Sequence, residues 1–166
     1  MTNETTQVAI IMGSDSDLPI VEAAFSILDS FGIKFTKNVM SAHRTPHDVM
    51  ELIKNSEQNG CKVFIAAAGM AAHLAGAVAA HSTKPVIGIP IESGGMGGID
   101  SLLSTAMMPP GVPVATVAVG KSGAKNSAIL AVQILATSDD DLTRKLKDYK
   151  ENMRTEVLEK DKKLNS

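Results

Sequence analysis

Five stretches of the chain carry the residue pattern of β-strands. The first, VAIIM, is an unbroken apolar run followed by Gly13. A run of this kind predicts a strand that is buried on both faces, as in a parallel sheet. The predicted strands cover residues 8–12, 34–40, 62–69, 85–91 and 112–120.

Each predicted strand is followed by a segment whose apolar residues recur at helical spacing. In the first of these segments the spacing runs from Ile20 to Phe31. Pro19 suits a first helical turn, and Gly32 is a typical stop just beyond a last turn. The later helices are predicted at about 46–60, 70–81, 97–108 and 124–137.

One additional helix is predicted near the C-terminal end, over about residues 139–160. Its apolar residues are three or four positions apart and form a single stripe on an otherwise polar helix. We expect the stripe to pack against the core or a neighbouring subunit, because an isolated helix gains little from it in water. The stripe consists of Leu142, Leu146, Tyr149, Met153 and Val157.

The alternation of strand and helix, repeated five times, predicts the fold class. It requires right-handed crossovers and yields a parallel sheet covered by helices on both faces. We expect one three-layer α/β domain over residues 1–166, with residues 1–7 disordered or extended. Ligands of such sheets bind beyond the carboxyl ends of the strands, so the loops that follow the strands are the candidates for function.

The composition argues against several classes of protein. The 166 residues are 44% apolar and 20% charged, which is typical of a globular chain. A net charge of −2 without a basic cluster argues against nucleic acid as a partner, and no apolar run reaches the ~20 residues that span a membrane. The polar first residues lack the apolar core of a signal peptide, and Cys61 is the single cysteine. We therefore expect a cytoplasmic protein with no disulfide and no metal.

The loop after the first strand, GSDSDL, places hydroxyl and carboxylate groups at the start of a helix. Free backbone N–H groups there form an anion site, to which Ser14 and Ser16 can add donors. Asp17 would repel a phosphate, so a ribose hydroxyl is a better partner for it. The alternative is ordinary capping of the helix by serine and aspartate.

The loop after the second strand, SAHRTP, also joins a strand to a helix. Arg44 offers a planar fork of donors that matches a phosphate, and His43 belongs to the only type of side chain whose unperturbed pKa lies near neutrality. We expect this loop to lie beside the first one at the edge of the sheet. The alternative is that Ser41 or Thr45 caps the helix and Arg44 is a surface charge.

The loops after the third and fourth strands are rich in alanine and glycine. Gly69 permits a close backbone approach, and His73 is expected in the first turn of the next helix. A histidine in an alanine-rich segment is more often packed than catalytic, so the local pattern favours packing for His73. The glycines at 94–98 suggest mobility or close contact, and they match neither the Walker nor the dinucleotide spacing.

These loops resemble those of a known family. GSDSD, SAHRTP and AGMAAHLAG are similar in order and spacing to the N5-carboxyaminoimidazole ribonucleotide mutases of purine biosynthesis. The similarity continues through SLLSTAMMPPGVPVATVAVG and GAKNSAILAVQILA and covers about residues 8–160. Arg44 favours the mutases over related enzymes that carboxylate aminoimidazole ribonucleotide directly with CO2, which typically carry lysine there. Met70 and Ala75 depart from the glycine and proline that are frequent in the family.

The resemblance implies a flavodoxin-like sheet of order 2-1-3-4-5 in a homo-octamer, with active sites near the subunit contacts. It implies a ribonucleotide substrate, no metal or organic cofactor, and a link to the ATP-dependent enzyme that makes the N-carboxylated ribonucleotide. His43 would act as general acid/base while a carboxylate moves from the exocyclic nitrogen to C4. Ser14, Asp17 and Arg44 would bind the substrate, and Ser16, Ser41, Gly69 and His73 would line the pocket.

Two other functions stay open at this point. The first is direct carboxylation of aminoimidazole ribonucleotide with CO2. The second is a non-catalytic module that binds flavin or nucleotide, although flavins favour aromatic stacking partners and the only Tyr or Trp is Tyr149.

Overall fold

The computed structural model describes residues 5–166, and its centre is a parallel sheet of five strands. The order β2-β1-β3-β4-β5 agrees with the expected order, and every neighbouring pair is parallel. The strands are β1 (Val8–Met12), β2 (Phe35–Val39), β3 (Val63–Gly69), β4 (Val86–Ile91) and β5 (Ala115–Thr116).

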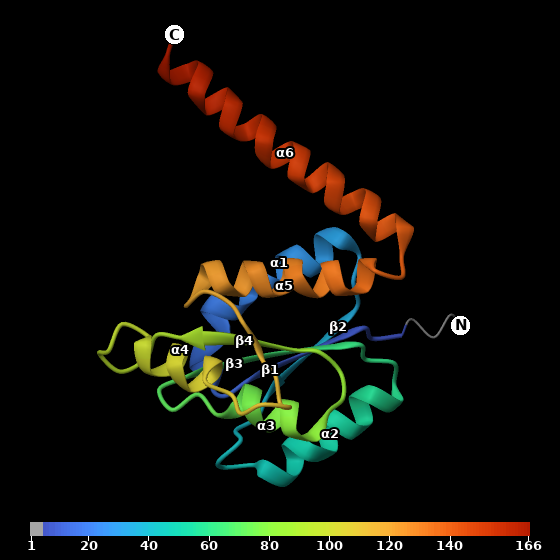
Figure 1. The fold of residues 1–166 in the computed structure, drawn as a ribbon, viewed down its shortest axis with the longest axis vertical. Helices are drawn as coiled ribbons and strands as arrows, with labels where there is room; N and C mark the ends of the chain where they lie inside the picture. The colour runs from blue at the N-terminus through green and yellow to red at the C-terminus, as the bar shows by residue number, and fades with distance from the viewer. Residues whose placement is uncertain (1–4) are drawn as a thin grey trace.

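Helices cover both faces of the sheet. Helices α1 and α5 lie on one face and α2 and α3 on the other, and α4 lies beside β4 and β5 (Figure 1). This arrangement confirms the predicted three-layer, flavodoxin-like α/β fold. The helices are η1 (Asp15–Asp17), α1 (Leu18–Phe31), α2 (Pro46–Gln58), α3 (Leu74–His81), α4 (Ile99–Ala106), α5 (Lys121–Ala136) and α6 (Asp140–Leu164).

The central strands are buried on both faces, as their unbroken apolar sequences predict. In β1, Val8 and Ile10 pack in the cluster formed with α1 and α5. Ala9 and Ile11 pack in the opposite cluster, formed with α2 and α3. Because successive side chains of a strand point to opposite faces, such a strand needs apolar residues in both registers.

The fifth strand is much shorter than the predicted 112–120. Only Ala115–Thr116 pairs regularly with β4. Pro113 has no N–H to give to a ladder, and the strand lies at the edge of the sheet. The chain still follows β4, because the N–H of Val117 donates to the Gly88 carbonyl at 3.1 Å and that of Gly120 to the Pro90 carbonyl at 3.0 Å.

Two helices begin later than the sequence predicts. Helix α3 was expected from residue 70, but Met70 has a left-handed backbone with φ of 54° and the helix starts at Leu74. Helix α4 was expected from residue 97, but Gly97 and Gly98 have φ of 64° and 80° and the helix starts at Ile99. A right-handed helix cannot include such residues, so both segments remain loops.

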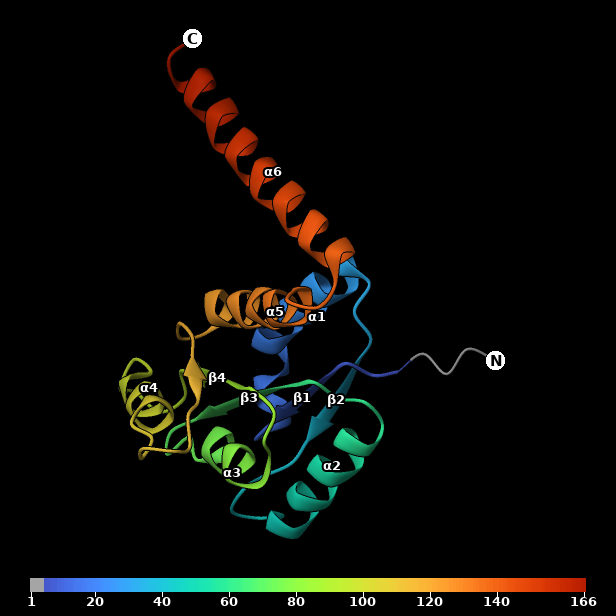
Figure 2. The ribbon, with the colours of Figure 1, turned by 45° about the vertical axis from the view of Figure 1, so that its right-hand side comes forward.

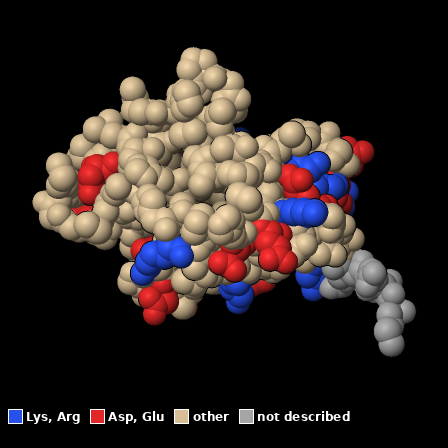
Figure 3. Space-filling view, turned by 90° about the horizontal axis from the view of Figure 1, so that it is seen from below, with Lys and Arg blue, Asp and Glu red and all other residues tan. Residues whose placement is uncertain are grey.

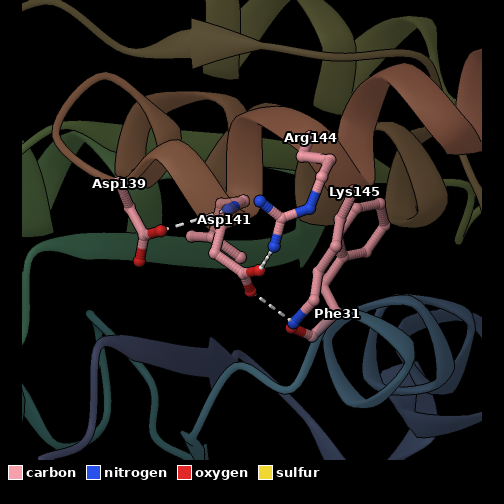
Figure 4. A network of polar contacts seen from close by, with 6 residues as sticks. Phe31, Asp139, Asp141, Arg144 and Lys145 are labelled. Carbon is pink, nitrogen blue, oxygen red and sulfur yellow. Dashed lines mark hydrogen bonds and ion pairs between the residues drawn. The ribbon is translucent and has the colours of Figure 1, made fainter.

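Helix α6 is attached to the body through its first turns. The Asp139 carboxylate (Figure 4) caps the helix by accepting the N–H of Leu142 at 3.1 Å. Leu142 itself is buried. Lys145 pairs with Asp141 at 3.0 Å and donates to the Phe31 carbonyl at 3.3 Å (Figure 4). A cation at the last carbonyl of α1 satisfies an orphan acceptor and complements the helix dipole.

The second half of α6 projects from the body of the protein. The ring of Tyr149 lies 5.6 Å from that of Phe31, but beyond it the helix leaves the other elements (Figures 1 and 2). Met153 is 43% exposed and Val157 is 63% exposed. The predicted stripe therefore meets the core through its first half, and its second half is uncovered within this chain.

No helix among residues 5–166 has the length and apolar character needed to cross a membrane.

Candidate functional site

The loops that follow β1, β2, β3 and β4 surround one cavity of about 510 Å³. It lies at the carboxyl edge of the sheet, where β1 has β2 on one side and β3 on the other, so that the strand order reverses. The structure brings all of the predicted site residues together there: Ser14, Ser16, Asp17, Ser41, His43, Arg44, Gly69 and His73.

The first loop is built as a capping box around η1. The Ser14 hydroxyl accepts the N–H of Ser16 at 3.3 Å, and the Asp17 carboxylate accepts the N–H of Ser14 at 3.2 Å. The Ser16 hydroxyl donates to the Ser14 hydroxyl at 2.9 Å. Capping, the alternative interpretation of this loop, is thus present, and the same three side chains also line the cavity. One loop can do both, because each hydroxyl has more than one bonding position.

The carboxyl of Asp17 is buried, and this changes its pKa. Burial raises the pKa of its carboxyl above the ordinary value, the hydrogen bond from the Ser14 N–H opposes this, and the nearby Asp15 adds to the rise. A carboxylate that is costly to ionise becomes more favourable when a ligand hydroxyl donates to it. Asp17 therefore suits a ribose hydroxyl, which the sequence also suggests.

Asp17→Asn is expected to raise thermal stability at pH 7. The raised pKa means that the folded protein binds this proton more tightly than the unfolded chain, so stability is lost as pH rises through the folded pKa. Asparagine removes that cost and still accepts from the Ser14 N–H. The advantage should shrink as pH falls toward the ordinary value of 3.8. Thermal unfolding between pH 4 and pH 8 measures it, with the exposed Asp29→Asn as control; equal melting temperatures of Asp17→Asn and parent at pH 7 contradict the expectation.

The second loop presents His43 and Arg44 from a tight turn. The Ser41 hydroxyl accepts the N–H groups of His43 and Arg44 at 3.3 and 3.2 Å. Thr45 closes the turn, because its hydroxyl accepts the Ser41 N–H at 3.0 Å and donates to the Ser41 carbonyl at 3.1 Å. Pro46 then begins α2. The two hydroxyls predicted as caps shape the turn, and the side chains of His43 and Arg44 line the cavity.

Arg44 connects the first two loops. Its Nη2 donates to the Gly13 carbonyl at 3.0 Å, across 31 positions of sequence. The guanidinium is therefore held at the carboxyl ends of β1 and β2, beside the start of η1. Arg44 is exposed, so it is a surface charge as the alternative has it, and this hydrogen bond fixes it to the first loop. The arginine fork and the helix start together form a suitable place for a phosphate.

His43 meets His73 across the cavity. Nε2 of His43 lies 2.8 Å from Nδ1 of His73, and the rings meet edge to face with centroids 4.9 Å apart. His73 is exposed and stands at the N-cap of α3, so the prediction that it is packed is wrong. Because α3 begins only at Leu74, His73 precedes the helix and its imidazole lines the cavity. A bond of this length requires a proton on one nitrogen and a lone pair on the other.

The sequence interpretation missed Ser93, which follows β4 and lines the cavity. A side chain at Gly69 would collide with its hydroxyl, so Gly69 is what admits Ser93 to this position. A hydroxyl directly after a buried strand was the available signal.

In the glycine-rich loop beyond Ser93, Gly94, Gly95, Gly97 and Gly98 all have positive φ, and Gly98 lies close to Val119. The expectation of close backbone contact thus holds at Gly98.

The cavity combines one guanidinium, several hydroxyls, two imidazoles and one carboxylate. Within residues 5–166 no group of three or more His, Cys, Asp or Glu side chains is arranged to hold a metal ion. The guanidinium and the hydroxyls can bind the phosphate and hydroxyls of a small molecule, and the imidazoles can exchange protons with it. Fold and cavity define a doubly wound α/β protein with a candidate small-molecule site at the carboxyl edge of its sheet.

Comparisons with known proteins identify the family within this class of α/β proteins. The family model described as AIR carboxylase matches residues 7–156, and the chain belongs to this family. The N5-carboxyaminoimidazole ribonucleotide mutase of Thermotoga maritima is 51% identical over 158 residues, which are 95% of this chain and 91% of the relative. The mutase of the same name from Escherichia coli is 45% identical over 157 residues, 95% of this chain and 93% of the relative.

A solved structure agrees with this assignment. The crystal structure of Treponema denticola PurE superposes with a TM-score of 0.87 at 32% identity, covering 96% of this chain and 99% of that one. The similarity extends over nearly the whole chain, so it includes the loops of the cavity as well as the sheet.

Proposed function

We propose that this chain converts N5-carboxyaminoimidazole ribonucleotide to 4-carboxy-5-aminoimidazole ribonucleotide, an isomerisation in de novo purine biosynthesis. The observation that carries the proposal is the pair His43 and Arg44, which faces the cavity from one loop, with Nε2 of His43 only 2.8 Å from a second imidazole. The curated relatives of 45–51% identity bear the name of this mutase. The pair supplies what such a substrate needs, a phosphate anchor beside a group that can exchange protons.

The reaction balances with a single proton carrier. The bond between the exocyclic nitrogen and the carboxylate breaks, CO2 is released, and the nitrogen takes a proton. Carbon C4 then forms a bond to the CO2 and releases its own proton. One imidazole can give the first proton and accept the second, and neither step needs an oxidant or reductant. We assign this role to His43.

The other residues of the cavity hold the ribonucleotide. Arg44 and the start of η1 bind the phosphate, and Asp17 accepts a ribose hydroxyl with Ser14 beside it. Binding energy from these remote groups positions the ring next to His43. Ser41, Ser16, Gly69 and His73 complete the walls. Retention of the released CO2 requires that the bound ribonucleotide exclude water from this cavity.

The structure weakens the proposal of a flavin module. Among the described residues that line the cavity there is no Phe, Tyr or Trp on which a flavin ring could stack. Tyr149 packs on Phe31 in the α1–α6 contact instead. Direct carboxylation would use the same groups to bind the ribonucleotide. The structure therefore does not distinguish it from the mutase reaction, and an experiment is needed.

The test of the proposed function is a pair of assays on the purified protein. In one, the protein receives the N-carboxylated ribonucleotide and formation of the C4 carboxylate is followed. In the other, it receives aminoimidazole ribonucleotide with bicarbonate. The proposal expects turnover in the first assay and much slower formation of the same product in the second. Faster formation in the second assay would identify a direct carboxylase.

We also propose that the chain assembles with copies of itself, as a homo-octamer. Between Val63 and Gly120 the Lys, Arg, Asp and Glu residues are only Lys84, Glu92 and Asp100. Figure 3 shows a broad stretch of one face that carries none of these side chains. Large apolar patches on a surface mark contacts with other proteins. On α4 and in the residues just before and after it, four large apolar side chains are more than half exposed: Met96, Ile99, Leu103 and Met107.

The projecting half of α6 is expected to contribute to this assembly. Met153→Ser combined with Val157→Ser should yield a smaller particle by light scattering, because these exposed apolar residues need a partner chain to cover them. Asn152→Ser with Glu156→Ser has the same spacing on an adjacent face and serves as control. An unchanged octamer in the first variant, with the circular dichroism of the parent, contradicts a role for this stripe.

The same proposal places the protein in the cytoplasm, after an ATP-dependent reaction. An amine carries a carboxylate only as an unstable carbamate, so the substrate must be supplied by an enzyme that spends ATP to join bicarbonate to the amine. The product, a carbon-bound carboxylate, is more stable.

A further inference from the structure

We propose that Ser104, on α4 and outside the cavity, is a positioning residue for the acid/base histidine. It holds the segment between Met70 and His73 in the place where His73 meets His43. This inference rests on the proposed function and deepens it, because it identifies what sets the geometry of the histidine pair.

The Ser104 hydroxyl joins two parts of the chain that are 32 positions apart. It accepts the backbone N–H of Ala72 at 2.9 Å and donates to the Asp100 carbonyl of its own helix at 2.7 Å. Oγ also lies 3.3 Å from the carbonyls of Met70 and Ser101. One hydroxyl can accept and donate together, so Ser104 fixes Ala72 against α4.

The segment that Ser104 holds has little regular structure of its own. It follows β3 and precedes α3, and Met70 within it has a left-handed φ of 54°. The N–H of His73 donates to the Ala71 carbonyl at 2.9 Å, so the segment is a turn. Ala72 is 1% exposed, and its N–H would lack a partner without the serine. Loss of a partner for a buried N–H is costly, so the turn would move to satisfy it.

Movement at Ala72 is transmitted directly to the next residue, His73. Its Nδ1 shares one proton with Nε2 of His43 over 2.8 Å. A displacement of about 1 Å would remove this bond, because hydrogen bonds weaken steeply with distance and angle. The position of His73 therefore decides whether Nε2 of His43 has this hydrogen-bond partner in the free protein. The Asp, Glu, Lys and Arg residues that line the cavity with this pair are Asp17 and Arg44.

The neighbouring residue Thr105 offers a matched control. Its hydroxyl is buried and donates to the Ser101 carbonyl at 2.7 Å within the same helix. It contacts the β4 strand at Gly88 and does not hold the segment from Met70 to His73. Thr105→Val removes a hydroxyl of α4 and keeps the shape of the side chain, as Ser104→Ala nearly does. The two variants separate the effect of the tether from a general weakening of α4.

The first experiment measures kcat and KM with the N-carboxylated ribonucleotide. Ser104→Ala is expected to lower kcat by about three- to tenfold with little change in KM, the size of effect that one lost hydrogen bond gives. Thr105→Val is expected to keep the parental kcat. Parental kcat in Ser104→Ala, or an equal loss in both variants, overturns the proposal.

The second experiment asks whether Ser104 acts through His73. In a double-mutant cycle, Ser104→Ala should cause almost no further loss of kcat once His73 is asparagine, because the tether then has nothing to position. Losses that multiply in the double variant would show that Ser104 acts by another route and would overturn the proposal.

The third experiment does not depend on turnover. In protein with 15N-labelled histidine, Ser104→Ala should shift the ring-nitrogen resonances of His43 and His73, whereas Thr105→Val should not. The assignments come from His43→Asn and His73→Asn. If the parent protein fails to convert the ribonucleotide, the proposed function fails while this experiment still decides the positioning role. Unchanged resonances in Ser104→Ala overturn it.

Discussion

His43→Asn is expected to lower kcat by about 10²- to 10⁴-fold while ribonucleotide binding persists. Loss of a general acid/base typically has this effect. Asparagine is similar in size and still forms hydrogen bonds, but it cannot titrate. The groups proposed to bind the substrate, Ser14, Asp17 and Arg44, remain in place. Their loops are held by hydrogen bonds to Ser41 and Gly13 that do not involve the imidazole.

The measurement is a titration of ribonucleotide binding beside a turnover assay on the same preparation. His47→Asn is the control, because His47 is exposed on the first turn of α2 and does not line the cavity. It should keep the parental kcat. If His43→Asn retains more than about a tenth of the parental kcat, a different group transfers the proton. His73, at 2.8 Å from His43, is then the next residue to replace.

Arg44→Ala is expected to lower kcat/KM by about ten- to a hundredfold. A hydrogen bond to a charged group contributes about 1.5–3 kcal/mol, and about 1.4 kcal/mol corresponds to a factor of ten. The substitution also removes the bond from Nη2 to the Gly13 carbonyl, which joins the first and second loops. Loss of that bond adds to the effect, since the two loops must present their groups to one substrate.

The assignment of Arg44 to the phosphate is tested with a second substrate. The loss caused by Arg44→Ala should be large for the ribonucleotide and small for the corresponding nucleoside, which has no phosphate. Arg44→Lys keeps the charge without the planar fork and should give an intermediate kcat/KM. If the parent protein uses nucleoside and nucleotide equally well, the phosphate contact does not exist.

Local sequence determined the elements and the placement of the polar loops. A strand such as β1 that is buried on both faces must be apolar at every position, and this pattern can be recognised from five consecutive residues. The carboxyl ends of parallel strands share one edge, so the groups of GSDSDL and SAHRTP were expected together. The strand order followed from the resemblance to a family, because local patterns carry no information about which strands become neighbours.

Other features were decided only by the tertiary structure. The sequence around His73 is alanine-rich and favours packing, yet the left-handed Met70 delays α3 and turns His73 toward His43. The Ser104 hydroxyl contacts Ala72, 32 positions away. Nothing in the local sequence around either residue predicts this contact.

The same distinction applies to the ends of the sheet and the chain. The apolar pattern at 112–120 predicts a strand, but at the sheet edge only two of its residues pair regularly with β4. The stripe of α6 is periodic along its whole length, yet only the part as far as Tyr149 lies over the core. Periodicity determines which face of an element is apolar. How much of that face is covered depends on where the element ends relative to its neighbours, and residues distant in the sequence set that position.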